Sequence, residues 1–576
     1  MIASNEKPNF VGASLIATLL TRLKVERVYG LQGGHIQPIW DAFTRMGGRV
    51  IDTRDERSAV HMAHAEAELG GNLGVAMVTA GPGVTNAVTG IANAEKARAP
   101  LLLIGGAVPR PQKGAGALQE MCQIDIMRPI TRAAICVQNV QRIEQDFLLG
   151  VSKAKGDGGV PGPVFIEVPT DVLREPVVVS SDTGKSEFVP KISIQKPDPS
   201  AIKEAVDLLW EATRPVIISG RGARSSAKAL SRLLEVTGSL YLDTQESRGL
   251  IAEDHPSVVS AVRGSVMREA DLVVTVGRKL DYQLGYGSPA VFPTARFLRI
   301  GDNLSELRDG RRGDVEVLGS VQLTCEAMVK IGQKRSSQVD TGWVEEQRSK
   351  HVERSGSLID KMASAVPGRD GLMHPYRLVS EIRKYINPET ILIADGGDIL
   401  SFCRISLISN TYLDSGVFGC LGVGVPFGVA AGIVYQDRRV MVVTGDGAFG
   451  FNAMELDTAV RHGSRVVFIV ANNGGWNIER TDQLQNYGGR IEGSELRFSD
   501  YAGLARSLGL YAERVYNPED LGGALERTFS RAPALLDVLV TRDAISPDAS
   551  SGLATVPDFQ PLTSWNDAET TLLGEK

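Results

Sequence analysis

The chain has 576 residues, more than one compact core usually holds, and this length predicts three or four domains. Its 68 acidic residues outnumber its 62 basic ones, giving a net charge of -6, which is not the composition of a nucleic-acid-binding protein. No apolar stretch approaches the roughly 20 residues that a membrane-spanning helix needs. We therefore expect neither a nucleic acid nor a membrane as a partner.

The cysteines and the first residues bear on location. Five cysteines are scattered along the chain without CxxC spacing, which favours a reducing interior over a disulfide framework or a zinc site. The first ten residues lack the basic and apolar segments of a secretory signal. A cytoplasmic protein is the expectation.

Short β-branched runs alternate with amphipathic segments along the whole chain, and glycines separate them. Apolar runs such as PLLLIGG and RVVFIVANN are typical of buried parallel strands, so the pattern predicts an α/β fold with doubly wound parallel sheets. Polar stretches near residues 185–200 and 334–370 resemble linkers. We therefore predict three domains and a C-terminal tail, with bounds at residues 1–185, 195–335, 360–545 and 546–576.

The two outer parts of the chain resemble each other. When the segment that starts at Thr79 is shifted by 365 positions, TAGPG falls on TGDGA at Thr444, and the apolar run 101–104 falls on 466–469. Any two β-α-β units share such spacing, so a chance likeness stays open. A duplicated domain on either side of a central one is the stronger interpretation.

Residues 439–476 carry the most informative motif. A predicted strand ends in Gly445-Asp446-Gly447, a helix continues to about Gly463, and a second strand leads to Asn472-Asn473. Asp446 and Asn473 are thus expected at the carboxyl ends of neighbouring parallel strands, where doubly wound sheets bind ligands. With a backbone carbonyl near Gly475 they offer only oxygen ligands, which suit Mg²⁺ completed by phosphate oxygens and water.

GDG followed by NN at this spacing resembles the diphosphate-binding signature of thiamine diphosphate (ThDP) enzymes. The resemblance implies ThDP and Mg²⁺ as cofactors. It also implies three doubly wound parallel-sheet domains, in the order pyrimidine-binding, central and diphosphate-binding, as in the acetolactate synthase-like superfamily. Within that superfamily the chain is most similar to 2-hydroxyacyl-CoA lyases, oxalyl-CoA decarboxylases and benzaldehyde lyase.

The resemblance further implies a carboxylate that activates the aminopyrimidine ring of the cofactor. Glu56, which opens an amphipathic helix ending near Gly70, matches that position. Such an acid must lose and regain a proton, and burial raises a carboxyl pKa in the required direction. The alternative is an ordinary first-turn glutamate stabilised by the helix dipole. We favour catalysis because GPG-x-TN, Gly81 to Asn86, follows at the family's distance.

Other cofactor contacts are implied by the same resemblance. Leu421 matches the large apolar residue that holds the cofactor bent, and Gly419 offers a carbonyl to its 4′-amino group. The full set of expected cofactor contacts is Glu56, Gly81, Asn86, Gly397, Asp398, Gly419, Leu421, Gly445, Asp446, Gly447, Ala448, Asn473, Gly475 and Trp476.

Two further residues distinguish members of the superfamily. His35 matches benzaldehyde lyase-like sequences and is suited to moving a proton to or from a substrate oxygen. Gln119, followed by Glu120, resembles the pattern of 2-hydroxyacyl-CoA lyases and is suited to hydrogen bonding a substrate oxygen. Oxalyl-CoA decarboxylases carry a tyrosine-glutamate pair at Leu118-Gln119, so oxalyl-CoA is disfavoured.

The central part suggests a second ligand site. GRGA at residues 220–223 resembles the ADP-binding turn of oxalyl-CoA decarboxylase-like enzymes, with Arg221 in the turn and Asp302 as a partner for a ribose hydroxyl. Arg263 and Arg404 are candidates to contact CoA phosphates. A surface salt bridge is nearly as plausible for each arginine. ADP is therefore a candidate third ligand.

Two segments are expected near the active site. The tail after residue 545 contains Phe559 and Trp565, and it is either plain disorder or a lid that closes over the substrate. Glu492 lies in the loop that follows Asn473 and is a speculative acid or base.

The sequence thus predicts a ThDP- and Mg²⁺-dependent carbon–carbon lyase that cleaves 2-hydroxyacyl-CoA, a small-molecule acyl-CoA, to formyl-CoA and an aldehyde or ketone. The alternative is a benzaldehyde lyase-like or acetolactate synthase-like carboligase acting on 2-hydroxyketones or 2-oxoacids. The resemblance also implies a homo-oligomer, a dimer or a homotetramer, with active sites between subunits.

Overall fold

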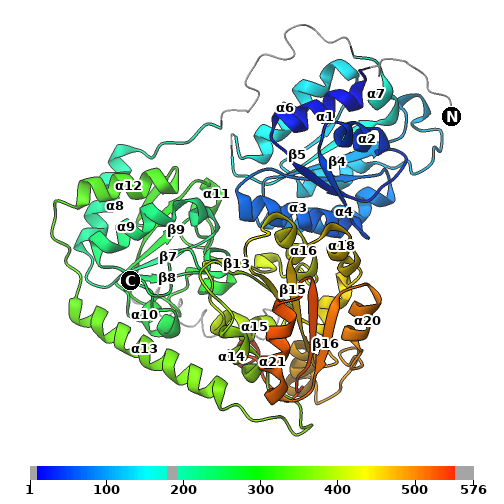
Figure 1. The fold of residues 1–576 in the computed structure, drawn as a ribbon. Helices are drawn as coiled ribbons and strands as arrows, with labels where there is room; N and C mark the ends of the chain where they lie inside the picture. Colours follow the sequence, from blue (N-terminus) through cyan, green and yellow to red (C-terminus); the bar gives the residue numbers. More distant parts are fainter. Residues whose placement is uncertain (1–9, 158, 178–191, 552–576) are drawn as a thin grey trace.

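The structure is a computed structural model that describes residues 10–157, 159–177 and 192–551 (Figure 1). Its first domain is built on a six-stranded parallel sheet in the order β2-β1-β3-β4-β6-β5. The strands are β1 (Arg27–Gly30), β2 (Arg49–Asp52), β3 (Gly74–Val78), β4 (Leu101–Ala107), β5 (Ala133–Cys136) and β6 (Pro163–Pro169). Its main helices are α1 (Gly12–Arg22), α2 (Gln37–Arg45), α3 (Glu56–Gly70), α4 (Pro82–Lys96), α5 (Gln123–Met127), α6 (Ile143–Ala154) and α7 (Thr170–Arg174).

The central domain has a five-stranded parallel sheet in the order β11-β10-β9-β7-β8. Its strands are β7 (Pro215–Ser219), β8 (Leu240–Leu242), β9 (Leu272–Val276), β10 (Arg296–Gly301) and β11 (Val315–Leu318). Helices α8 (Pro199–Glu211), α9 (Ala227–Thr237), α10 (Arg263–Glu269), α11 (Leu304–Leu307) and α12 (Val321–Gly332) belong to this domain.

The third domain repeats the first. Its sheet, β13-β12-β14-β15-β17-β16, has the same order of successive strands as the first sheet, and β4 shifted by 365 positions coincides with β15. The predicted internal likeness is confirmed at the level of topology. The strands are β12 (Ile391–Asp395), β13 (Thr411–Leu413), β14 (Val440–Gly445), β15 (Val466–Asn472), β16 (Tyr511–Val515) and β17 (Ala534–Leu539). The helices are α14 (Pro375–Arg383), α15 (Asp398–Ser406), α16 (Gly424–Val434), α17 (Asp446–Asn452), α18 (Glu455–His462), α19 (Asn477–Asn486), α20 (Tyr501–Ser507), α21 (Pro518–Phe529) and α22 (Pro547–Ser551).

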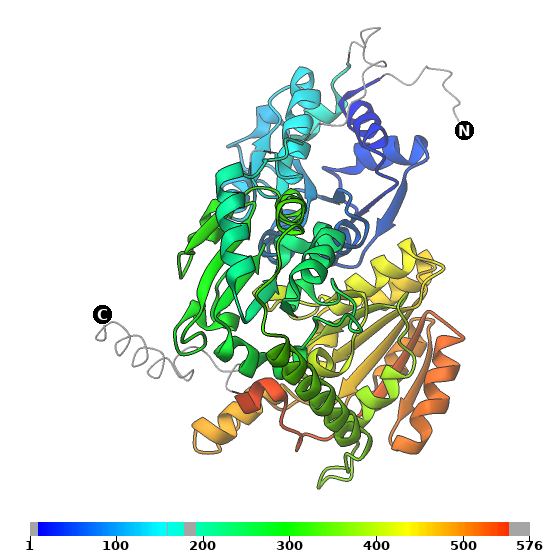
Figure 2. The ribbon, with the colours of Figure 1, turned by 90° about the vertical axis from the view of Figure 1, so that its left-hand side faces the viewer.

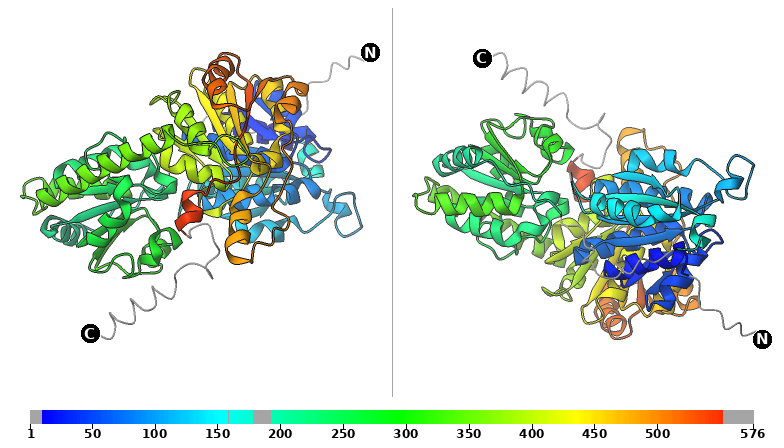
Figure 3. Two further views of the ribbon diagram at one scale, coloured as in Figure 1. Left: turned by 90° about the horizontal axis from the view of Figure 1, so that it is seen from below. Right: turned by 90° about the horizontal axis from the view of Figure 1, so that it is seen from above.

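The two outer domains share one hydrophobic core. Helix α3 of the first domain lies on α16 of the third (Figure 1), and one buried cluster runs through both. The ring of His64 meets that of Phe427 edge-on, with centroids 5.0 Å apart. Helix α16 reads GVPFGVAAGIV and is apolar on all sides, as expected for a helix buried between two sheets. The central domain lies to one side of this pair (Figures 2 and 3).

Two segments differ from the predicted elements. The stretch 334–370, expected to be a linker, contains the 23-residue helix α13 (Thr341–Ala363), which runs from the central to the third domain (Figure 1). The helix expected after GDG is divided into α17 and α18, and at the end of α17 Nδ2 of Asn452 donates to the Gly422 carbonyl at 2.6 Å. Among the described residues, no helix has both the length and the apolar character needed to cross a bilayer.

Candidate active site

Asp446 and Asn473 lie side by side where two neighbouring strands end. Strands β14 and β15 pair in parallel with Gly445 opposite Ala471, so the residues that follow meet at one edge of the sheet. The backbone N–H of Asn473 donates to Oδ1 of Asp446 at 3.4 Å. Oδ1 of Asn473 accepts from the N–H of Gly475 at 3.1 Å. The structure thus brings the three predicted metal ligands together.

The Asp446 carboxylate is buried and only partly hydrogen bonded. The residue is 1% exposed, and Oδ2 has no hydrogen-bond partner among the described residues. Burial raises the pKa of this carboxyl to about 7. An unpaired buried carboxylate oxygen is costly unless a proton or a cation compensates it, and Mg²⁺ prefers such hard oxygen ligands. The residues at this edge therefore fit Mg²⁺.

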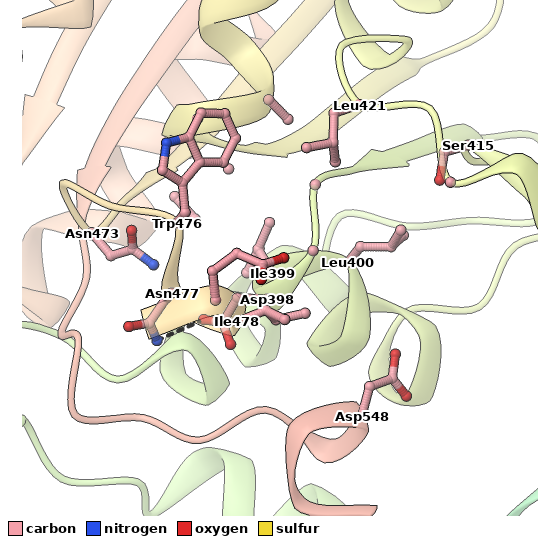
Figure 4. A pocket seen from close by; sticks show the side chains of 18 of the residues that line it. Asp398, Ile399, Leu400, Ser415, Leu421, Asn473, Trp476, Asn477, Ile478 and Asp548 are labelled. Atoms are coloured by element: carbon pink, nitrogen blue, oxygen red, sulfur yellow. Dashed lines mark hydrogen bonds between the residues drawn. The ribbon is translucent and has the colours of Figure 1, made fainter. Parts of the chain in front are cut away.

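A cavity of about 310 Å³ opens beside this edge (Figure 4). A Cβ at Gly447 would lie 2.5 Å from the Trp476 ring, so glycine is required there and the backbone stays open to a close phosphate. Most of the predicted cofactor contacts line the cavity: Gly397, Asp398, Gly419, Leu421, Gly445, Asp446, Gly447, Ala448, Asn473, Gly475 and Trp476.

A buried polar pair, Asp398 and Asn477, also lines the cavity. Of these two residues, only Asp398 was predicted from the sequence. Nδ2 of Asn477 donates to Oδ2 of Asp398 at 3.3 Å (Figure 4). Within the part of the chain that the structure describes, Oδ1 of each residue has no partner. Burial raises the pKa of Asp398 to about 6. Asn477 comes four residues after Asn473, on the first turn of α19. This short distance in the sequence from a predicted ligand is the signal by which Asn477 could have been predicted. Gln245 and Tyr282 of the central domain line the same cavity, and no local motif indicated them.

Glu56 lies in the first domain, at the start of α3. Asp55 caps this helix by accepting from the N–H of Arg57 at 2.8 Å, and Gly71 ends it in the left-handed region at φ 65°. The Glu56 side chain is 5% exposed, and Nδ2 of Asn86 donates to its Oε2 at 3.0 Å. Two predicted residues of the pyrimidine half are therefore in direct contact.

His35 and Gln119 lie together at the carboxyl edge of the same sheet. Burial lowers the pKa of His35, and a hydrogen bond with the Gln119 side chain offsets part of this effect. Nδ1 of His35 is buried and has no hydrogen-bond partner in the described ranges. Gln119 has a left-handed backbone at φ 65°, which is strained for a non-glycine residue and typical of functional sites.

The predicted residues thus form two separate groups within one chain. The residues that line the 310 Å³ cavity all come from the central and third domains, and the first of them in the sequence is Gln245. Glu56, His35 and Gln119 of the first domain are not among them. Glu492 is exposed and borders a neighbouring surface groove with Gln483, whose Nε2 donates to the Glu492 carbonyl at 2.8 Å. Its role as an acid or base stays a prediction.

The residues proposed for ADP are bound to other protein groups. Nη2 of Arg221 lies 2.6 Å from Oε1 of Glu68, and Oδ1 of Asp302 lies 3.3 Å from Nη1 of Arg98. In the GRGA turn, the N–H of Gly222 donates to the Gly277 carbonyl at 2.9 Å. The crevice beside Arg221 measures about 20 Å³, which is room for about one water molecule. These pairings argue against a nucleotide at these residues.

The two arginines proposed for CoA differ in position. Arg263 is partly buried, its Nη1 donates to the Asp243 carbonyl at 2.7 Å, and desolvation lowers its pKa to about 10. Arg404 lines the cavity, and its Nε lies 3.1 Å from Oδ2 of Asp414. Asp548 of α22 lines the cavity too, and its N–H donates to Oγ of Ser401 at 2.8 Å. Phe559 and Trp565, on which the lid hypothesis depends, lie outside the described residues.

Comparison with family models gives three matches in chain order. The N-terminal TPP binding domain of thiamine pyrophosphate enzymes matches residues 10–127, the central domain matches 202–328, and the C-terminal TPP binding domain matches 399–538. Each match falls on one of the three parallel sheets.

Curated relatives cover nearly the whole chain. A 2-hydroxyacyl-CoA lyase 2 of Caenorhabditis elegans is 31% identical over 89% of this chain and 85% of the relative. An acetolactate synthase large subunit of Mycobacterium tuberculosis is 32% identical over 93% and 97%. A 2-hydroxyacyl-CoA lyase 2 of Homo sapiens is 30% identical over 86% and 84%. With its three matched domains and a cavity lined by the GDG residues and Asn473, this chain belongs to the thiamine pyrophosphate enzymes, alongside relatives named 2-hydroxyacyl-CoA lyase and acetolactate synthase.

Proposed function

We propose that this ThDP-dependent enzyme is a carbon–carbon lyase that cleaves a 2-hydroxyacyl-CoA to formyl-CoA and an aldehyde or ketone, and that it requires Mg²⁺. The main support is the similarity to 2-hydroxyacyl-CoA lyases across 89% of the chain, combined with the Gln119-Glu120 pair that resembles their pattern. Arg404 is the cationic residue best placed to meet a CoA phosphate, since it lines the cavity.

In this proposal Asp446, Asn473 and the carbonyl of Gly475 hold Mg²⁺. The glycine-lined wall receives the diphosphate, and Leu421 packs against the cofactor. ThDP, when bound there, would supply a nucleophilic carbanion for the thioester substrate. The unpaired Oδ2 of Asp446 supports this assignment, because it gives the metal a buried and otherwise uncompensated ligand.

Glu56 is proposed to hold and exchange a proton with a ring nitrogen of the aminopyrimidine. Its burial keeps water from competing for that proton, and the Asn86 amide fixes Oε2. The other oxygen, Oε1, is thereby left for the ring.

His35 and Gln119 are proposed to act on the substrate oxygens. As the bond between C1 and C2 breaks, a neutral His35 can accept the proton of the C2 hydroxyl, and its lowered pKa keeps the imidazole neutral at pH 7. Gln119 can donate a hydrogen bond to the thioester carbonyl oxygen, where negative charge develops.

We further propose that a complete site needs two subunits, in a homodimer or a dimer of dimers. Support comes from the cavity, whose lining includes no residue of the first domain. A cytoplasmic location is proposed with it, since all five cysteines are unpaired.

A carboligase acting on 2-hydroxyketones or 2-oxoacids is the second candidate. The acetolactate synthase relative supports this candidate, since it is 32% identical over 93% of the chain. The distinction therefore depends on the substrate.

The test is incubation of the protein, loaded with ThDP and Mg²⁺, with 2-hydroxyacyl-CoA, benzoin and pyruvate in parallel. Release of formyl-CoA from the thioester, without turnover of the other two, is the expected result. Cleavage of benzoin alone, or acetolactate formation from pyruvate alone, would replace the lyase proposal with the carboligase.

A further inference from the structure

One buried side chain of the first domain connects the ends of three strands at the predicted active-site edge. We propose that Gln123, held in place by Glu167, is a positioning residue for His35, Gln119 and Glu56. The inference rests on the proposed function, because it concerns the residues assigned to catalysis there. Gln123 is not expected to touch the substrate or the cofactor itself.

The Gln123 side chain makes three hydrogen bonds within the protein. Its Oε1 accepts from the N–H of Gly81 at 2.6 Å, just after β3. Its Nε2 donates to the carbonyl of Gly106 on β4 at 3.1 Å and to Oε2 of Glu167 on β6 at 2.7 Å. The side chain is 2% exposed. Because Nε2 faces two acceptors and Oε1 faces a donor, a flip of the amide by 180° would break all three bonds, so only one orientation is allowed.

The hydrogen bond between Gln123 and Gly81 helps to hold Gln119 in place. Gly81 has a left-handed backbone at φ 62°, and a Cβ there would lie 2.7 Å from the carbonyl oxygen of Gln119. The two backbones are therefore packed against each other without room for a side chain. Because Gln119 is itself in a strained conformation, it needs such a rigid neighbour to stay there.

The hydrogen bond between Gln123 and Gly106 helps to hold His35 in place. A Cβ at Gly106 would lie 2.6 Å from both the Cβ and the carbonyl oxygen of His35. The His35 backbone thus rests directly on the strand segment whose carbonyl Gln123 binds. A shift of this segment would move the imidazole relative to Gln119.

The hydrogen bond between Gln123 and Gly81 also affects the position of Glu56. Gly81 is the N-cap of α4, and Asn86 on the second turn of that helix donates to Glu56 at 3.0 Å. The position of the Asn86 amide therefore depends on where α4 begins. One glutamine side chain thus sets the relative positions of all three proposed catalytic residues.

Glu167 fixes the glutamine in turn. It is 6% exposed, lies at the carboxyl end of β6, and faces Cys136 of β5 in register. Burial, together with the charge of Glu167 and a hydrogen bond to it, raises the pKa of Cys136 to about 12. The thiol therefore stays protonated beside Glu167.

The test compares Gln123→Met with Gln138→Met. Methionine keeps the volume of Gln123 and removes its side-chain hydrogen bonds, whereas Gln138 is an exposed glutamine of the same domain whose Nε2 donates to the Cys136 carbonyl at 3.1 Å. We expect kcat to fall at least tenfold in Q123M and to stay unchanged in Q138M. The ThDP concentration for half-saturation should change less than threefold in both, since the third domain carries the diphosphate contacts.

A readout without cofactor separates positioning from turnover. Amide hydrogen exchange over residues 79–86 of the cofactor-free protein should become faster in Q123M and not in Q138M. Glu167→Gln keeps an acceptor for the Gln123 amide and should retain most of the turnover, whereas Glu167→Leu should behave like Q123M. Phe147→Leu, in a hydrophobic cluster of the same domain, is the control for a general loss of stability.

Wild-type kcat and unchanged exchange in Q123M would overturn the inference, as would an equal loss of kcat in a Phe147→Leu protein of the same unfolding temperature. If the wild type turns over none of the three substrates, the proposed function fails instead. The exchange experiment then still decides whether Gln123 holds the Gly81 turn.

Discussion

Nη2 of Arg221 lies 2.6 Å from Oε1 of Glu68, so an arginine of the central domain is bound by a carboxylate on α3 of the first domain. Burial alone would raise the pKa of Glu68, but the charges of Arg221 and Arg224 and a hydrogen bond with His64 hold it well below its usual value. A sequence motif that resembles a nucleotide-binding turn serves here as a contact between domains.

The first prediction is that ADP does not bind the central domain. Millimolar ADP should leave the unfolding temperature unchanged, because Arg221 and Asp302 are already paired with protein groups. Glu68→Gln should lower the free energy of unfolding by about 2 kcal/mol, since it removes the charge that pairs with two partly buried arginines, Arg221 and Arg224. A clear rise of the unfolding temperature with ADP, absent in Arg221→Ala, would contradict this reading.

The second prediction concerns Glu56. Glu56→Gln keeps the shape of the side chain and its contact with Asn86 but removes the exchangeable proton, so kcat should fall about 100-fold or more. ThDP affinity should change only slightly. Glu66→Gln, on the same helix and bonded to Tyr29 at 2.6 Å, is the matched control and should keep kcat. Turnover of E56Q at the wild-type rate would remove Glu56 from the mechanism.

Local patterns carried much of the fold and one half of the site. Strand-length apolar runs and glycine turns predicted the parallel sheets, and the spacing from GDG to NN placed Asp446 beside Asn473, because parallel neighbours end at the same edge. The Arg221–Glu68 pair joins residues whose surrounding patterns are unrelated, so no spacing rule anticipates it. For the same reason Gln123 was missed, since a glutamine shows its role only when three strand ends surround it.

The third prediction follows from the raised pKa of Asp446. The folded, cofactor-free protein binds a proton at this carboxyl up to about pH 7, whereas an unfolded aspartate loses it near pH 4. Between these values the folded state holds more protons, so this group makes stability fall as pH rises, by up to about 1.4 kcal/mol per pH unit.

Asp446→Asn removes this dependence, since the amide does not titrate. Relative to wild type, the cofactor-free D446N protein should therefore gain stability as pH rises from about 4 to 7, with a constant difference above that. Denaturant unfolding at several pH values measures the difference. Magnesium should no longer stabilise D446N in the presence of ThDP. An equal pH dependence in both proteins would show that Asp446 is already ionised in the fold.

The last prediction tests whether the two groups of site residues come from different subunits. An E56Q chain has an intact cavity in its third domain, and a D446N chain has an intact first domain. If sites form between chains, a mixed dimer contains one site with both intact halves and one with neither. Equal co-expression gives mixed dimers in half of the population, so activity should recover to about a quarter of wild type. Isolation of mixed dimers through two different tags should raise this to about half. If each site formed within one chain, every site in the mixture would carry one of the two substitutions, and mixing would restore nothing.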